Sequence, residues 1–385
     1  MNLITLENWY SRYREESLFG RYINLDHIGP LLETLAHKID IKEIALSENN
    51  EPIHLVTLGS GPKKLLLWSQ MHGNESTTTK ALFDLINLLN DTNNEVTKNV
   101  LQQCTLFIVP ILSPDGARAY TRHNYNNVDL NRDAQNLTQK ESKVLNSLIK
   151  EIKPDYGFNL HGQRTIFSAG ETNNPATVSF LSPAGDQERS ITESRKIAME
   201  VIGKMNVVLQ QCIPNQVGRY DDGFNINCVG DTLENIGIPT ILFEAGHYPN
   251  DYNRETTREY IFYSLIASIH YIAQNDITGE GYEDYFLIPE NGKCYHDVII
   301  RDVILEGKNV DIAVQYTEEL GENNVNFIPK IVKIEDLGKF YGHREIIGKK
   351  RVMRNEIVTV EIVPEVKLLK FYLDSELFSI ELAKR

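Results

Sequence analysis

The sequence predicts an α/β protein with a mixed, largely parallel central sheet flanked by helices, followed by a small β-rich C-terminal domain. Over roughly the first 275 residues, short apolar runs typical of buried strands alternate with segments of helical periodicity. That alternation is typical of a sheet covered by helices on both faces. Beyond residue 283 the helical periodicity gives way to short strand-like runs.

The first domain is predicted to span residues 1–278. A short helical lead-in covers residues 1–20, and Asp26 is expected to cap a helix over residues 28–37. Ser113 to Gly116 read as a turn. The predicted strands are residues 42–46, 52–58, 65–69, 105–112, 156–160 and 239–243. The later helices are predicted at residues 77–89, 140–152, 192–211 and 253–272.

The second domain is predicted to span residues 279–385, an ordinary size for an independent unit. We find no chemical motif in this part of the sequence, and its role stays open. Its predicted strands are residues 298–305, 310–316, 328–334, 356–363 and 366–373.

The charge balance and the cysteines limit the possible partners and the compartment. A formal net charge of −14 argues against nonspecific binding to nucleic acid or to an anionic membrane surface. No apolar run approaches the roughly 20 residues that span a bilayer, and the first residues do not resemble a signal peptide. We therefore expect a cytoplasmic protein. The sequence does not indicate its oligomeric state. The cysteines form no Cys-x-x-Cys pair and are expected to be free, buried thiols: Cys104, Cys212, Cys228 and Cys294.

The most informative motif follows the apolar run at residues 65–69. That run leads into a glycine-containing turn that carries His72 and Glu75. A histidine and a carboxylate at the end of a buried strand could form half of a catalytic zinc site. Such a site needs about three protein ligands and one open position.

Two further predicted strands also end in polar residues of the right chemistry. The strand at residues 156–160 runs into His161, and the strand at residues 239–243 runs into Glu244. In α/β sheets, functional sites form at the carboxyl ends of the strands. We therefore expect His72, Glu75 and His161 to bind one zinc ion, with Glu244 left uncoordinated as a base.

A polar loop between these segments contains a possible anion-binding group. Arg122, Asn131 and Arg132 lie within a dozen residues of one another. Arginine presents a planar set of donors that matches a carboxylate. The loop therefore indicates recognition of a substrate carboxylate near the metal.

Taken together, these motifs resemble the zinc carboxypeptidases of the funnelin (M14) type. They occur in the family's order and cover roughly residues 20–275. The matching residues are His72-Gly-Asn-Glu75, Pro114-Asp-Gly116, Thr121-Arg122, Val128-Asp-Leu-Asn-Arg132, Leu160-His161 and Phe243-Glu244.

The resemblance implies one Zn²⁺ per chain, held by His72, Glu75 and His161. It implies that Asp129 orients the first histidine ligand, as carboxylates beside metal-bound imidazoles do. Glu244 would act as general base on a zinc-activated water and then carry the proton to the leaving amine. The implied reaction is hydrolysis of the C-terminal peptide bond.

The resemblance also implies roles in substrate binding. Arg122 would stabilise the oxyanion of the tetrahedral intermediate, and Asn131 with Arg132 would hold the terminal carboxylate. Tyr220 lies in about the right interval for the family's substrate-capping tyrosine, although a plain loop aromatic is an equal interpretation. Asp133 replaces a frequent asparagine, and it either weakens anion binding or turns outward. The preferred side chain of the substrate stays open.

A second interpretation is a zinc-dependent N-acyl amino acid deacylase of the succinylglutamate desuccinylase and aspartoacylase type. That group also shows His-Gly-Asn-Glu and Asp-Leu-Asn-Arg, and a C-terminal β domain fits either group. Pro114 to Gly116 and the surroundings of Arg122 favour the peptidase. A metal-free binding module would require loss of a ligand or of the base, and none is lost. The expected substrate is a peptide or an acyl amino acid with a free carboxylate.

Overall fold

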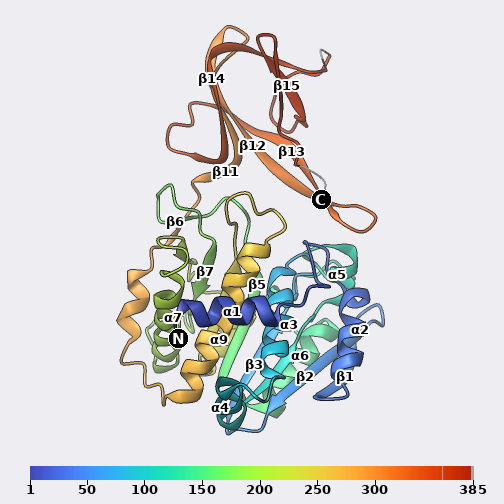
Figure 1. Ribbon diagram of the computed structural model, residues 1–385, viewed down its shortest axis with the longest axis vertical. Helices are drawn as coiled ribbons and strands as arrows, with labels where there is room; N and C mark the ends of the chain where they lie inside the picture. Colours follow the sequence, from blue (N-terminus) through green and yellow to red (C-terminus); the bar gives the residue numbers. More distant parts are fainter. Residues whose placement is uncertain (358, 383–385) are drawn as a thin grey trace. The chain divides into compact units, whose positions relative to one another are not determined.

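The computed structural model describes residues 1–357 and 359–382, which form two compact units (Figure 1). Unit 1 consists of Met1–Gln163 and Ala176–Asn291. Unit 2 consists of Arg164–Pro175 and Gly292–Arg385. The second unit is therefore built from two separate stretches of the sequence.

Unit 1 contains an eight-stranded sheet in the order β1-β2-β4-β3-β5-β9-β7-β8. The strands are parallel from β4 through β3 and β5 to β9, and also between β7 and β8; the other neighbours are antiparallel. The predicted mixed, largely parallel sheet is confirmed. The strands are β1 (Asp40–Leu46), β2 (Pro52–Gly59), β3 (Lys63–Ser69), β4 (Cys104–Val109), β5 (Tyr156–Gly162), β7 (Val178–Leu181), β8 (Val217–Arg219) and β9 (Thr240–Ala245).

Two hydrophobic clusters lie on the two faces of this sheet. On β3, Leu65 and Leu67 belong to one cluster, whereas Leu66 and Trp68 belong to the other. Alternate residues of a strand point to opposite faces, so both faces are covered by helices. The first face packs against α1 (Leu3–Tyr13), α2 (Leu25–Leu35), α3 (Thr77–Leu89), α4 (Glu95–Gln103), α7 (Glu193–Leu209) and α9 (Glu255–Gln274). The second packs against α6 (Lys140–Ile152) and α8 (Val229–Asn235).

The sequence mispredicted two local features of unit 1. Asn24, not Asp26, caps α2, because the Asn24 side chain accepts a hydrogen bond from the backbone of Asp26. The predicted turn at Ser113 is followed by a short helix, α5 (Pro114–Ala119), since the fixed φ of proline suits a first helical position. Two α-helices and two strands of unit 1 were also missed, namely α4, α8, β7 and β8.

The division between the units differs from the predicted boundary after residue 278. The short 3₁₀ helix η2 (Tyr282–Leu287) belongs to unit 1, because Tyr285 and the following Ile288 are buried in the core on the α7 and α9 face. The other 3₁₀ helix, η1 (Leu130–Arg132), lies in the polar loop of unit 1. The strand β6 (Ser168–Ala169) lies in unit 2, and β10 (Asn291–Gly292) spans the boundary.

Unit 2 contains a six-stranded sheet in the order β13-β12-β11-β14-β15-β16. Its strands are β11 (Tyr295–Leu305), β12 (Lys308–Leu320), β13 (Val325–Glu335), β14 (Tyr341–Asn355), β15 (Lys370–Leu373) and β16 (Glu376–Ser379). Residues 365–368, just before β15, exchange backbone hydrogen bonds with Pro329 and Ile331 of β13. Residues 365–368 thus pair with the edge strand β13, whereas β16 forms the opposite edge. The inner face of the sheet forms a separate hydrophobic core.

The predicted strand at residues 356–363 is wrong for the residues that the structure describes, which form turns and loop; residue 358 lies outside them. The true strand, β14, precedes it. Its alternation is interrupted at Gly348, Lys349 and Lys350, where the two lysines have φ of 55° and 58°. The register with β11 shifts there, as expected for a bulge.

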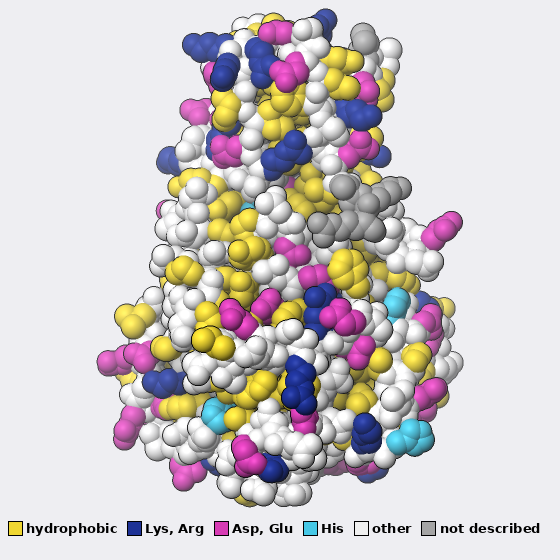
Figure 2. All heavy atoms as spheres, in the orientation of Figure 1, with side chains coloured by type: hydrophobic (Ala, Val, Ile, Leu, Met, Phe, Trp, Pro, Cys, Tyr) yellow, Lys and Arg dark blue, Asp and Glu magenta, His cyan; other side chains and the backbone are white. Residues whose placement is uncertain are grey.

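The four cysteines are free, as predicted. Cys104 is buried, but the other three are only partly buried, so that part of the prediction is wrong. On the face of Figure 2, Lys and Arg side chains are interspersed with Asp and Glu. Within the described residues, no helix combines the length and apolar character needed to cross a membrane.

Candidate metal centre

The loop between β3 and α3 is held by close backbone packing. A Cβ atom at Gly73 would lie 1.8 Å from the backbone carbon of Gly116, so only glycine fits where the two segments cross. Gln70, with φ of 44°, donates from its side chain to the carbonyls of Ile23 and Gly73. The loop that carries His72 is therefore fixed by the motif at residues 114–116, which explains why both motifs occur in one site.

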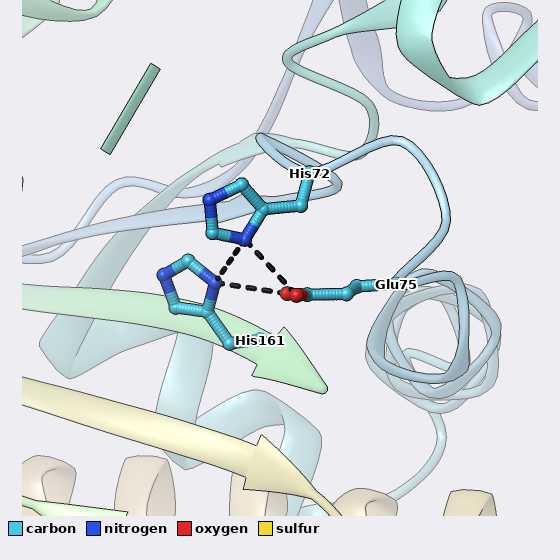
Figure 3. A group of neighbouring side chains, drawn as sticks. All are labelled: His72, Glu75 and His161. Carbon is cyan, nitrogen blue, oxygen red and sulfur yellow. Dashed lines mark hydrogen bonds and ion pairs between the residues drawn. The ribbon is translucent and has the colours of Figure 1, made fainter. Parts of the chain in front are cut away.

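His72, Glu75 and His161 point their ligand atoms at a common centre (Figure 3). The Nδ1 atoms of the two histidines lie 3.2 Å apart. Each of these nitrogens lies 3.0 Å from an oxygen of Glu75. Ligands on a tetrahedral zinc ion with bonds of ~2.0–2.1 Å are about 3.3 Å apart. The donor set and its spacing therefore fit one zinc ion, and these residues are brought together as the sequence predicted.

Asp129 determines which nitrogen of His72 faces that centre. Its Oδ1 atom lies 2.9 Å from Nε2 of His72 and also accepts from the backbone of Asn131. A proton on Nε2 is donated to Asp129, which leaves the lone pair of Nδ1 for a cation. Hydrogen bonds from His72 and Arg122 outweigh burial and hold the pKa of Asp129 well below its usual range.

The charges of the three ligands depend on one another. Burial opposes a charge on His72, but Glu75 and Asp129 outweigh it and raise the pKa of His72 to about 9. Burial lowers the pKa of His161. The pKa of Glu75 lies well below its usual range, because the two histidines outweigh the burial that opposes its charge. The two histidines thus keep Glu75 ionised in a buried position, where a bound cation would be favoured.

Glu244 lies beside this centre on the neighbouring strand. Its register partner on β5 is His161, and the preceding partners Leu160 and Phe243 are both buried on the α7 and α9 face. His161 and Glu244 therefore point to the opposite face together. Glu244 is 8% exposed, and its Oε2 atom has no hydrogen-bond partner among the described residues. Burial and the nearby charge of Glu75 raise its pKa well above the ordinary value.

Part of the chain is similar in sequence to known zinc carboxypeptidases. Residues 31–147 match the model of the zinc carboxypeptidase family. A stretch of 137 residues is 28% identical to Carboxypeptidase SOL1 of Arabidopsis thaliana, covering 31% of this chain and 28% of that protein. The chain thus matches less than a third of the length of this relative.

Solved structures share the fold of unit 1. A metallo-carboxypeptidase from Burkholderia cenocepacia has a TM-score of 0.52 at 18% identity, over 65% of this chain and 68% of that one. A metallo-carboxypeptidase from Pseudomonas aeruginosa has a TM-score of 0.51 at 15% identity, over 65% and 68% of the two chains. The chain is thus similar to zinc carboxypeptidases in sequence over residues 31–147 and in fold.

Arg122 lies directly beside the candidate ligands. Its guanidinium donates to Asp129 at 3.0 Å and lies 3.5 Å from Glu75. Its NH1 atom is 3.3 Å from Nδ1 of His72. The side chain is 42% exposed, so it can also reach a substrate group. The position fits the predicted role at a developing oxyanion, which stays a prediction.

Asn131 and Arg132 lie in η1, which begins directly after Asp129. Asn131 is buried, and its Oδ1 accepts from the backbone of Val229 at the start of α8, which directs the amide nitrogen the other way. Arg132 is exposed and donates from NH1 to the Asn131 carbonyl and to Sγ of Cys228. Because a guanidinium has five N–H donors, others are left for a carboxylate.

Asp133 does not turn outward, so that alternative is wrong. Its carboxylate is buried and accepts hydrogen bonds from the backbones of Thr138 and Gln139, which hold its pKa below the usual range despite burial. These hydrogen bonds join Asp133 to the residues just before α6 and so hold this part of the polar loop together. Tyr220 is partly buried directly after β8, the edge strand, and its backbone donates to Phe180. Its role as a substrate cap stays a prediction.

The sequence did not reveal two neighbours of the site. One is Cys228, which contacts Arg132 from the start of α8. The other is Arg254, which precedes α9 and donates to the ends of both β5 and β9. A cation just before a helix, where the helix dipole disfavours positive charge, was the one signal that could have indicated Arg254.

Proposed function

We propose that this protein is a zinc-dependent metallocarboxypeptidase that hydrolyses the C-terminal peptide bond of peptides. The observation that carries the proposal is the convergence of His72, Glu75 and His161, with the carboxyl of Glu244 on the neighbouring strand. A ligand triad with a separate buried carboxyl is the composition expected of a hydrolytic zinc site.

The metal and the base have separate tasks in this proposal. His72, Glu75 and His161 would hold zinc, which when bound supplies Lewis-acid polarisation of the scissile carbonyl and lowers the pKa of water. Glu244 accepts a proton from the attacking water and returns it to the leaving amine. A raised pKa suits that task, because a general base works best when its pKa is near the working pH.

The remaining residues bind the substrate. Arg122 donates to the oxygen of the scissile carbonyl as negative charge develops, an interaction worth about 3–4 kcal/mol when one such donor is removed. Asn131 and Arg132 hold the terminal carboxylate by charge-assisted hydrogen bonds. These roles require that the substrate carries a free carboxylate.

The named relatives support this class of substrate. SOL1 is a carboxypeptidase by name, and the Pseudomonas aeruginosa enzyme binds (2-guanidinoethylmercapto)succinic acid, a derivative of a carboxylic acid. Carboxylate recognition in this chain would use the exposed guanidinium of Arg132.

The test is a substrate panel with the zinc-loaded full chain. It contains peptides with a free C-terminus, the same peptides amidated, N-acetyl-aspartate and N-succinyl-glutamate. We expect turnover of the free peptides alone. Turnover of the N-acyl amino acids without any peptide cleavage would overturn the proposal in favour of the N-acyl amino acid deacylase, for which the same ligands and base would serve.

A further inference from the structure

Arg254 ties together the ends of the two strands that carry the third ligand and the base. Its guanidinium is buried at 3% exposure and donates from NH1 to the carbonyl of Ala245 and from NH2 to the carbonyl of Gln163. Ala245 directly follows Glu244, and Gln163 follows His161 by two residues. One planar side chain thus spans the points at which β9 and β5 end.

The carbonyls that Arg254 holds are themselves fixed in place. The Ala245 carbonyl also accepts from the backbone of Gln163 at 3.0 Å. The side-chain amide of Gln163 donates from its nitrogen to the Ala176 carbonyl and accepts at its oxygen from the Asn291 side chain. Ala176 and Asn291 lie at the margins of unit 1. Arg254 is therefore joined to a rigid hydrogen-bonded network and not to a mobile loop.

The guanidinium and the ligand Glu75 both lie close to Gly162. A Cβ atom at Gly162 would meet NH1 of Arg254 at 3.5 Å and the side chain of Glu75 at 3.5 Å, so these groups flank the same glycine. The backbone N–H of Gly162 in turn donates to Glu75 at 3.0 Å. Arg254 consequently lies near the ligand group without belonging to it.

Arg254 adopts a conformation that α9 does not require. Its φ of 57° and ψ of 35° lie in the left-handed region, which is unfavourable for a residue with a side chain. A cation at a helix N-terminus is also disfavoured by the helix dipole. The helix start is capped by Asp251, whose carboxylate accepts from the backbones of Glu255 and Thr256. Arg254 occupies the N-cap position, but its side chain makes no capping hydrogen bond.

We propose that Arg254 is a positioning residue that sets the spacing between His161 and Glu244 through the backbones of β5 and β9. This inference rests on the proposed function, since it assigns His161 to the metal and Glu244 to the reaction. Arg254 acts through these backbones and is not one of the three proposed ligands. Its removal would take one donor from each of two carbonyls and leave the strand ends joined by the backbone hydrogen bond between Gln163 and Ala245 alone beyond the ladder.

The test uses the full chain with Arg254→Met and Arg254→Lys, and Arg258→Met as the matched control. Arg258 lies four residues later, inside α9, is fully buried, and donates to Asp84 and to the Leu18 carbonyl, neither of which belongs to the ligand group. Zinc affinity by chelator competition, kcat and KM for a free peptide, and Tm are measured for each protein.

We expect Arg254→Met to weaken zinc affinity and to lower kcat by about 10–100-fold each, with little change in KM. Arg254→Lys, which keeps the charge and a donor, should recover part of both losses. Arg258→Met should lower Tm while zinc affinity and kcat stay near wild type.

Wild-type zinc affinity and kcat in Arg254→Met would overturn the inference. So would equal losses in Arg258→Met, because they would reduce the effect to general destabilisation. If Arg254→Met does not fold, Arg254→Lys decides the question, provided that its Tm equals that of the wild type. Wild-type kcat and zinc affinity in Arg254→Lys would then overturn the inference, and a reduced kcat and zinc affinity would support it. If the wild type binds zinc but cleaves no peptide, the proposed function fails, and zinc affinity alone still decides the role of Arg254.

Discussion

Glu244 and His161 are register partners on the adjacent parallel strands β9 and β5, and both side chains point to the face opposite the α7 and α9 core. The proposed base and the third ligand therefore share one hydrogen-bonded sheet edge. The strand ladder brings them within about 4.8 Å of each other along the backbone, and the proposed role of Arg254 is to hold the strand ends just beyond that ladder. A site built in this way keeps its geometry before any substrate arrives.

Replacing the base should separate catalysis from metal binding. Glu244→Gln keeps the size of the side chain but cannot accept the proton, so we expect kcat to fall by about 10²–10⁴-fold. Zinc content, measured by atomic absorption on the dialysed protein, should stay near one ion per chain. Near-normal turnover by this variant would show that Glu244 is not the base.

A second buried glutamate offers a matched control. Glu234 on α8 is 3% exposed, and burial raises its pKa to about 7. Its Oε1 accepts from the backbone of Thr240, which an amide oxygen can also do. We expect Glu234→Gln to retain wild-type kcat, so an equal loss in both variants would point to a general effect of removing a buried carboxyl.

Loss of a ligand should abolish metal binding and activity together. His72→Ala removes one of three donors, and we expect neither stoichiometric zinc nor peptide turnover after dialysis. His54→Ala on β2, outside the ligand group, should keep both. Stoichiometric, tightly bound zinc in His72→Ala would show that the metal lies elsewhere.

The carboxylate behind His72 should control zinc affinity. Asp129→Asn removes a charged acceptor of the His72 Nε2 proton, so we expect zinc affinity to fall by about 10–100-fold in chelator competition. Asp133→Asn serves as a control in the same loop, because Asp133 binds Thr138 and Gln139 instead of a ligand. The prediction fails if Asp129→Asn binds zinc as tightly as the wild type.

Removing the exposed guanidinium should weaken recognition of the terminal carboxylate. We expect Arg132→Ala to raise KM for a free peptide by about 10–100-fold, the effect of losing a hydrogen bond between charged groups of about 1.5–3 kcal/mol. The preference for free over amidated peptide should shrink in the same variant. Steady-state kinetics on both peptides measure it, and an unchanged preference would contradict the assignment.

The raised pKa of Glu244 predicts a pH-dependent stability of the zinc-free protein. Its folded pKa lies above the ordinary value of 4.5, so the protonated form is favoured by folding. The stability that this group contributes is present below pH 4.5 and is lost as pH rises through the folded pKa. Glu244→Gln should therefore be more stable than wild type at pH 8, with a smaller difference at pH 4. Urea midpoints at both pH values measure this, and a difference that shrinks toward pH 8 would contradict it.

Elements with strong local patterns were predictable from the sequence. The helices α3 and α6 were placed at their observed ends, because their leucines and isoleucines recur at helical spacing. The ligand group was predictable because each ligand follows an apolar strand, and strand ends of a parallel sheet meet at one edge.

Features that depend on distant partners were not predictable. The strand β14 carries Gly348 and two left-handed lysines in its middle, so its alternation fails, and its pairing with β11 compensates. Arg254 looks like a surface residue in the sequence, and its partners Gln163 and Ala245 come from two other elements. The local signal, a cation just before a helix, does not indicate which distant residues are its partners.

The split composition of unit 2 has a consequence for how the chain folds. Thr165 accepts through its carbonyl from His343, and Ile166 accepts from the backbone of Tyr295, yet these partners are synthesised far later than residues 164–175. Because chains emerge from the ribosome N-terminus first, this segment has to wait unpaired until almost the whole polypeptide has been made. Unit 2 can therefore fold only late in synthesis. Deletion of residues 292–385 would leave residues 164–175 without these partners.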